Sequence, residues 1–142
     1  VFDSWVGTLN KEDYRQFVMP YSQKLISSIA DMGVPVIHFA NNGAALLDLV
    51  KQAGGDVIGI DWRINIDEAW EKLGVDVAIQ GNLDPALLFA PPQVIEEKVK
   101  DILQRAGGRR GHIFNLGHGI NKDTPVDHVI AMVEAVHKYS QR

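Results

Sequence analysis

The stretch DVIGIDW, residues 56 to 62, is a short, mainly apolar run that ends in an acidic and an aromatic residue. A run of this length and composition is typical of a buried strand. A compact helix is predicted before it, in residues 44 to 53 and closed by Gly54, and another after it, from Asp67 to Leu73 and stopped by Gly74. The centre of the chain therefore reads as helix, strand, helix.

The same alternation extends toward the amino terminus. Asn10 is the expected N-cap of a long helix that Gly33 ends, with a kink at Pro20 and a strand following in residues 34 to 40. The opening VFDSWVG, residues 1 to 7, passes from apolar to polar as the end of a strand does, so we expect the chain to be part of a longer protein. Helical spacing predicts that one face of the long helix is buried through Tyr14, Phe17, Val18, Tyr21, Leu25 and Ile29.

Toward the carboxyl terminus, strands are predicted in residues 76 to 83 and 111 to 117. A helix between them begins at Pro91-Pro92 and ends before Gly107-Gly108. Its expected buried stripe comprises Ile95, Val99, Ile102 and Ala106. Thr124-Pro125 is the expected N-cap and first residue of the final helix, whose apolar spacing picks out the face of Val126, Ile130, Val133 and His137.

Strands that alternate with helices, and that are apolar on both faces, favour a parallel sheet. The fold class is therefore α/β. No compositional shift marks a boundary, so residues 1 to 142 are read as one domain. About four βα units fit either a small, open, doubly wound sheet or half of a (β/α)8 barrel, and the pattern by itself leaves both open.

Composition excludes several classes of function. The formal charge of −4 and the lack of a basic cluster beyond Arg109-Arg110 argue against nucleic-acid and anionic membrane surfaces. The chain has no cysteine, so disulfides, thiolate metal sites and cysteine nucleophiles are excluded, and a reducing cytoplasm is compatible. The apolar runs are too short to span a bilayer.

Polar loops follow each predicted strand, at the end where ligands bind in both candidate architectures. His118, in the segment FNLGHGI of residues 114 to 120, is the strongest candidate there. It is either a solvated turn residue or an imidazole that faces a cleft and can bind a carboxylate or move a proton near neutral pH. The glycines on either side of it, Gly117 and Gly119, would let the backbone turn sharply.

Other polar residues receive structural interpretations or remain open. His38 lies inside an apolar run and is read as a core histidine, and the other histidines are read as structural or exposed. Asp61 and Asp84 are either acid–base carboxylates or caps of turns. Arg63 either binds an anion or pairs with Asp67. A phosphate site is disfavoured because the segment GNLDP carries an acid and no lysine.

Five segments together carry a specific resemblance. FDSWVG, VIGIDW, IQGNLDP, FNLGHGI and VEAVHKYS occur in the order of the carboxy-terminal part of the uroporphyrinogen decarboxylase family, which the chain resembles throughout. The resemblance implies part of a (β/α)8 barrel. It also implies cofactor-independent removal of carboxyl groups from the acetate side chains of uroporphyrinogen III, giving coproporphyrinogen III in haem biosynthesis.

By the same resemblance, His118 contacts a substrate carboxylate and is a candidate for proton handling. Ser4 supplies a hydroxyl donor, and Phe2 forms an apolar wall for the pyrroles. The family's arginine-rich motif, pyrrole-binding aspartate and pocket tyrosine have no counterpart in this chain, so Ser4 and His118 are not expected to suffice alone. A related zinc-dependent methyltransferase family is disfavoured, because His38-Phe39-Ala40 and His118 stand where its His-x-Cys pair and later cysteine would be.

Two hypotheses follow for function. In one, the chain is part of the decarboxylase and becomes active when an amino-terminal half completes the barrel around a porphyrinogen. In the other, it is an inert, truncated or engineered half-barrel. Open edges of a parallel sheet favour pairing, so self-association is expected in both cases, with a homodimer of two four-stranded copies closing an eight-stranded barrel.

Overall fold

The structure, a computed structural model, describes residues 1–141 of the chain. Five strands form one parallel sheet in chain order: β1 (Phe2–Asp3), β2 (Ile37–Ala40), β3 (Val57–Gly59), β4 (Ala78–Gln80) and β5 (His112–Ile113). β1 is the strand end that the opening residues predict, and it makes the number of strands five instead of about four. One further bridge, between Leu83 and Leu116, extends the pairing of the last two strands.

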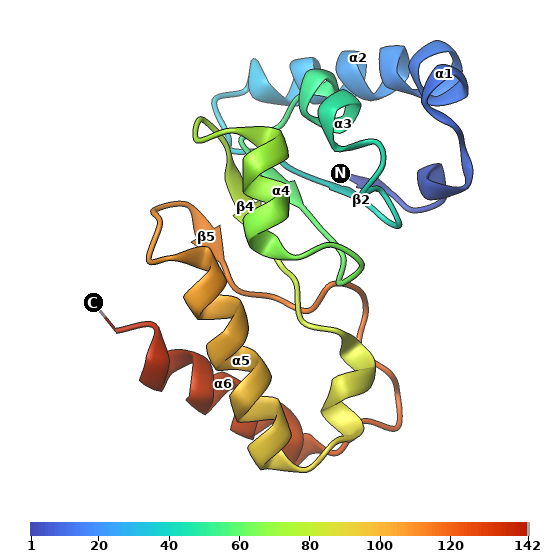
Figure 1. Cartoon of the computed structure of the whole chain (residues 1–142). Coiled ribbons are helices and arrows are strands. Elements are labelled where there is room, and N and C mark those ends of the chain that lie inside the picture. The colour runs from blue at the N-terminus through green and yellow to red at the C-terminus, as the bar shows by residue number, and fades with distance from the viewer. Residues whose placement is uncertain (142) are drawn as a thin grey trace.

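Six α-helices accompany the strands within the described residues: α1 (Lys11–Asp13), α2 (Met19–Ala30), α3 (Leu47–Ala53), α4 (Ile66–Leu73), α5 (Pro92–Ala106) and α6 (Val126–Tyr139). Figure 1 shows them following the strands in the same sequence, from α1 and α2 at one end to the adjacent pair α5 and α6 at the other. None of the described helices has the length and apolar character that crossing a membrane requires.

The order of the strands decides between the two architectures that the sequence leaves open. In a doubly wound sheet the order reverses at a switch point, whereas every strand here pairs with its neighbour in the chain. A run of parallel strands in unbroken order, each followed by a helix, is the arrangement of a (β/α)8 barrel. The chain therefore forms a partial barrel of five strands.

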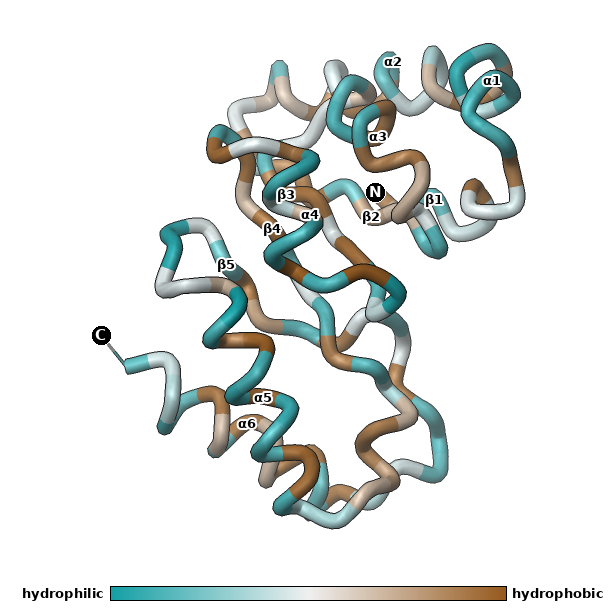
Figure 2. Tube along the Cα trace, viewed as in Figure 1, coloured by the Kyte–Doolittle hydropathy of each residue, from teal (hydrophilic) through white to brown (hydrophobic). Residues whose placement is uncertain are grey.

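The core lies between the sheet and the helices. Figure 2 shows mainly apolar strands around β3 and β4, and alternating apolar and polar turns along α4 and α5. The stripe predicted on α5 is confirmed, because Ile95, Val99, Ile102 and Ala106 are all buried. The predicted glycine stop is also confirmed, since Gly107 takes the left-handed conformation with φ 62°.

The first long helix differs from the prediction in the face that it buries. Asn10 caps it as expected, with its side chain accepting from the Asp13 amide at 2.9 Å. The segment Tyr14–Val18 then forms a π-helical turn, in which the Met19 amide bonds to the Tyr14 carbonyl. Pro20 follows and has no N–H to continue the α-helical ladder. The predicted kink is thus present as a wider turn.

This wider turn inserts one residue into the helical repeat and so rotates the following helix by about 100°. Ser22 and Ile26 are buried in place of Tyr21 and Leu25. The prediction is therefore wrong for three residues after Tyr14, because a period of 3.6 residues does not survive the insertion, whereas Val18 and Ile29 are half-buried and Val18 packs on the core. The exposed side chains include Phe17, Tyr21 and Leu25.

The final helix corrects two further expectations. α6 begins at Val126, preceded by Pro125, and the Thr124 hydroxyl makes no cap and is buried without a partner in the described structure. The predicted face of Val126, Ile130, Val133 and His137 is exposed. The helix packs on α5 through its other side, where Ala135 is buried, because no strand lies beyond β5 in the described chain to cover the predicted face.

Candidate functional site

A cavity of about 530 Å³ lies at the carboxyl ends of the strands and is lined by residues from β1, β2 and β4 and from the loop after β5. Phe2, Ser4 and His118, the residues that the resemblance assigns to the site, all line it. Three that sequence reasoning missed also do so: Phe39, Gln80 and Asn115. Their places in the sequence could have identified them, because Phe39 and Gln80 are at or next to the last residue of a strand and Asn115 follows a strand closely.

The pleat of β1 and β2 directs side chains into this cavity. Phe2 pairs in register with Phe39 of β2, and their rings meet edge to face with centroids 6.0 Å apart. Ser4 lies two residues after Phe2 and so shares its side of the strand, while Asp3 points to the other side. The Ser4 carbonyl accepts from the Asn41 side chain at 3.3 Å, which ties the end of β1 to β2.

His118 is exposed and faces the ring of Phe39, at 6.3 Å between centroids. The chain bends at Gly117 and His118, as expected, but neither adjacent glycine has a positive φ, so the bend does not depend on a left-handed conformation. A Cβ on Gly117 would lie 2.7 Å from the Trp62 backbone nitrogen, whereas one on Gly119 would meet nothing within 4 Å. Gly117 is required for close approach of two loops, and that approach places His118 at the cavity.

The core interpretation of His38 is confirmed. The side chain is fully buried, its Nε2 lies 2.8 Å from Asp3 Oδ2, and its Nδ1 lies 3.1 Å from the Gly54 carbonyl oxygen. Burial pushes the pKa of Asp3 upward, but the hydrogen bond and charge of His38, with a hydrogen bond from Ser22, outweigh it. The pKa of Asp3 is consequently lowered. This pair lies behind the cavity and does not line it.

Asp61 is structural. It is almost completely buried and accepts from the backbone amides of Asn42 and Arg63, the latter at 2.8 Å. The Arg63 guanidinium also reaches Asp61, at 3.1 Å, and stacks over Trp62 at 4.1 Å. The alternative pairing of Arg63 with Asp67 is therefore wrong, because the nearer carboxylate lies two residues back in the same turn.

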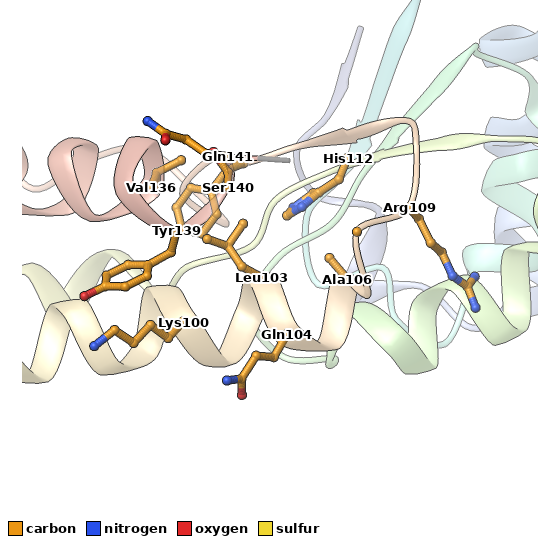
Figure 3. Close-up of a pocket in the computed structure, with 12 residues that line it drawn as sticks. Lys100, Leu103, Gln104, Ala106, Arg109, His112, Val136, Tyr139, Ser140 and Gln141 are labelled. Atoms are coloured by element: carbon orange, nitrogen blue, oxygen red, sulfur yellow. The ribbon is translucent and has the colours of Figure 1, made fainter.

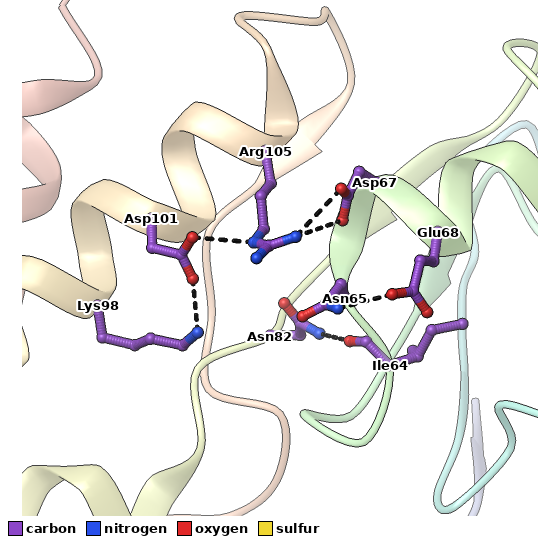
Figure 4. Close-up of polar contacts among 8 residues, drawn as sticks. All are labelled: Ile64, Asn65, Asp67, Glu68, Asn82, Lys98, Asp101 and Arg105. Atoms are coloured by element: carbon purple, nitrogen blue, oxygen red, sulfur yellow. Dashed lines mark hydrogen bonds and ion pairs between the residues drawn. The ribbon is translucent and has the colours of Figure 1, made fainter.

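Figure 4 shows where Asp67 is engaged instead. Arg105 of α5 bonds both to Asp67 of α4, at 3.2 Å, and to Asp101 one turn earlier, at 2.9 Å. In the same view Asn82 donates to the Ile64 carbonyl at 2.6 Å. Arg105 therefore joins α5 to α4, and Asn82 joins the loop after β4 to the loop after β3.

Asp84 caps a turn, which was one of its two interpretations. Its side chain accepts from the Ala86 amide at 2.9 Å, at the start of the 3₁₀ turn Pro85–Phe89. Asp84 also lines a neighbouring hollow that His118 shares, on the other side of the loop after β5. The acid–base role is not supported by any contact of its carboxylate with the main cavity.

A larger cavity, of about 730 Å³, opens between α5, α6 and the start of β5 (Figure 3). Its wall includes Lys100, Tyr139 and His112. His112 donates through Nε2 to the Gly81 carbonyl at 3.0 Å, and burial lowers its pKa. This cavity lies at the amino end of the sheet and next to its open edge, away from the polar strand ends, so it is not the candidate active site.

No cluster of three or more His, Cys, Asp or Glu side chains in residues 1–141 is arranged to hold a metal ion. His38 and His118, which stand where the methyltransferase family has metal ligands, point to different places. His38 contacts Asp3 behind the sheet, and His118 contacts Phe39 in the cavity. The acid–base and binding chemistry available here is that of hydroxyl, amide and imidazole groups around an aromatic wall.

Comparison with known proteins gives consistent results. The family described as uroporphyrinogen decarboxylase (URO-D) matches residues 1–139. The uroporphyrinogen decarboxylase of Carboxydothermus hydrogenoformans is 59% identical over 140 residues, covering 99% of this chain and 40% of that protein. That of Sorangium cellulosum is 53% identical over 137 residues, covering 96% of this chain and 39% of that protein. The chain therefore spans about two fifths of the length of these relatives.

Among solved structures, a methyltransferase from Methanosarcina mazei superimposes with a TM-score of 0.80 at 22% sequence identity. The match covers 94% of this chain and 39% of that one. Similarity at this level of identity concerns the fold, and it agrees with the partial barrel read from the strand order.

Proposed function

This chain belongs to the uroporphyrinogen decarboxylase family, and from that premise we propose that it is the carboxy-terminal part of an enzyme that decarboxylates a porphyrinogen. The reaction converts the acetate side chains of uroporphyrinogen III to methyl groups, giving coproporphyrinogen III, without metal or organic cofactor. The observation that carries the proposal is that Phe2, Ser4 and His118 all line one cavity at the carboxyl ends of the strands.

Each of these residues has a role suited to that substrate. Ser4 donates a hydrogen bond to a carboxylate, and His118 binds a second carboxylate or transfers a proton to the reacting pyrrole. Phe2 and Phe39 supply an apolar wall against which pyrrole rings pack. Loss of carbon dioxide follows protonation of the electron-rich pyrrole, and the site must stabilise the resulting cation electrostatically.

The proposed enzyme needs more than this chain. A (β/α)8 barrel has eight strands and the structure supplies five, which leaves three to be provided by the rest of the protein. A substrate with eight carboxylates also needs cationic groups, and no Lys or Arg lines the cavity in the described residues. We therefore propose that the remaining part of the enzyme, acting in the cytoplasm, is the partner.

The strand number also revises the expected homodimer. Closure of an eight-stranded barrel by two copies assumed four strands in each, whereas two copies of this sheet would bring ten. Self-association through the exposed edges remains the alternative to assembly with the missing part. It would use apolar side chains such as Phe17 and Tyr21 at one end of the sheet and Val126 and Ile130 at the other.

The test is porphyrinogen decarboxylation by this chain alone and mixed with the separately produced remainder of the enzyme, with sedimentation of both samples. We expect activity only in the mixture, together with a complex of one copy of each part. An inactive mixture in which the complex forms would overturn the proposed function. A stable homo-oligomer that excludes the remainder would favour the inert self-associating module.

A substitution of His118 tests its role in the completed enzyme. His118→Asn retains a polar side chain but removes the titrating imidazole, and we expect kcat to fall by about tenfold to a hundredfold. The free energy of unfolding should change by less than about 0.5 kcal/mol, because His118 is exposed. Unchanged turnover would return His118 to the interpretation as a solvated turn residue.

A further inference from the structure

The side of β1 that faces away from the cavity carries a buried polar network. Asp3 lies between Phe2 and Ser4 and points to the opposite side of the strand. Its Oδ2 atom accepts two hydrogen bonds, from His38 Nε2 at 2.8 Å and from the Ser22 hydroxyl at 3.0 Å. His38 is completely buried, and the Asp3 side chain is 15% exposed. Phe2 and Ser4, which line the cavity, therefore flank an aspartate whose carboxylate is hydrogen-bonded on the opposite side of the strand.

The second ring nitrogen of His38 is also held by a hydrogen-bond partner. Nδ1 lies 3.1 Å from the Gly54 carbonyl oxygen, which can only accept. Both ring nitrogens of His38 therefore face an oxygen, Asp3 Oδ2 on one side and the Gly54 carbonyl on the other, and these two contacts fix the plane of the ring. Gly55 has φ +120°, and a Cβ on it would lie 3.0 Å from the His38 Cβ, so the turn after α3 is shaped around this histidine.

The other groups around the pair are neutral or directed elsewhere. Tyr14 is fully buried near Asp3, and burial together with the Asp3 carboxylate raises the pKa of its phenol, which keeps it uncharged. The amino group of Val1 donates to the Ile37 carbonyl at 2.8 Å. Within the described residues, His38 and Ser22 are the side chains that hydrogen-bond Asp3, and the charge of the Val1 amino group also helps to lower the pKa of Asp3.

The pair adds a side-chain anchor to β1, a strand whose other hydrogen bonds with β2 are a few backbone bonds and one from the Asn41 side chain. Its ladder with β2 comprises two positions, Phe2 with Phe39 and Asp3 with Ala40, and its other edge is unpaired in the described chain. A strand this short gains little from backbone pairing alone, whereas a buried, hydrogen-bonded pair of side chains fixes its rotation about its own axis. That rotation determines whether Phe2 and Ser4 face the cavity.

We propose that His38 is a positioning residue of the candidate active site, which acts through Asp3 to orient Ser4 and Phe2 toward the substrate. The inference rests on the proposed function for its kinetic consequence only. His38 touches neither the cavity nor a substrate, and the resemblance assigns it no role. Any loss of activity on substitution of His38 should therefore arise from displacement of Phe2 and Ser4.

Two variants of His38 separate its two hydrogen bonds. His38→Gln places an amide nitrogen near the position of Nε2 and keeps a donor for Asp3, whereas His38→Asn reaches only toward the Gly54 carbonyl. In the completed enzyme we expect His38→Asn to lower kcat/KM by about tenfold or more and His38→Gln by no more than about threefold. Equal losses in the two variants would overturn the role of the contact with Asp3.

A second background distinguishes positioning from general destabilisation. In a Phe2→Ala/Ser4→Ala enzyme both oriented side chains are already truncated, so His38→Asn should lower kcat/KM by less than about threefold further. A full additional tenfold loss in that background would mean that His38 acts through overall stability, and the proposal would be wrong. The folded fraction of each variant is measured by circular dichroism under the assay conditions.

Nuclear magnetic resonance of the 142-residue chain tests the geometry independently of catalysis. His38→Asn should shift the amides of Phe2 and Ser4, with a smaller shift in His38→Gln. Unshifted amides in His38→Asn would overturn the inference even in an active enzyme. If the completed wild-type enzyme is inactive, the proposed function fails while these spectra still decide the positioning.

Should His38→Asn not fold, Ser22→Ala takes its place in both measurements. It removes one of the two donors to Asp3 and leaves the contact with His38. Shifts in the same direction but smaller are expected at Phe2 and Ser4, and their absence would count against the network as the device that orients β1.

Discussion

Replacing Asp61 by alanine is expected to destabilise the chain by about 3 kcal/mol. The substitution leaves two partly buried backbone amides, those of Asn42 and Arg63, without an acceptor, and each such loss costs about 1–3 kcal/mol. The guanidinium of Arg63 adds little, because that side chain is 43% exposed. Asn42 is also held in a left-handed conformation, φ 55°, and loses its anchor.

Asp84→Ala is the matched control, since it removes an aspartate that also follows a strand but accepts from a single amide. Loss of such a cap is expected to cost about 1 kcal/mol. Urea unfolding followed by circular dichroism measures both variants. If Asp61→Ala proved no more destabilising than Asp84→Ala, while abolishing turnover in the completed enzyme, Asp61 would regain its acid–base interpretation.

Gly117→Ala is expected to destabilise the chain by about 2–3 kcal/mol and to displace His118 from the cavity. The new Cβ would lie 2.7 Å from the Trp62 nitrogen and 3.1 Å from two backbone atoms of Asp61. Those atoms cannot yield easily, because the bonds to the Asp61 side chain hold this turn in place. Overpacking against rigid backbone typically has a penalty of this size.

Gly119→Ala, two residues away in the same motif, is the control. A Cβ there meets no atom within 4 Å and φ is not positive, so a change below about 0.5 kcal/mol is expected. Urea unfolding gives the energies, and the ring resonances of Phe39 report whether His118 stays beside it. Equal destabilisation by the two substitutions would show that both glycines act through backbone freedom, as the sequence alone suggests.

Much of the local structure could be predicted from the sequence. Asn10 as a cap, the buried stripe of α5 and the glycine that ends it depend on residues a few positions apart, and each is present in the structure. The faces of α2 and α6 could not be predicted from spacing. A π-turn before Pro20 rotates the first, and the absence of a strand beyond β5 in the described chain leaves the second uncovered.

The candidate site was predictable only in part. The resemblance assigned Phe2, Ser4 and His118, and all three line one cavity, whereas Phe39, Gln80 and Asn115 emerged from the structure. Asp61 and Asp84 looked alike in the sequence, because each follows a strand and precedes a helical turn. Their burial and partners differ through contacts with loops far away in the chain.

By itself, the sequence determined the alternation of strands and helices, the α/β class and the membership of the family, because these depend on local periodicity and on the order of motifs. The tertiary structure decided that the strands pair in chain order, that Asp3 and His38 meet behind the sheet, and that Gly117 approaches Trp62. These are contacts between residues 20 or more positions apart in the chain. Local spacing carries no information about such contacts, since they arise only when the strands pack.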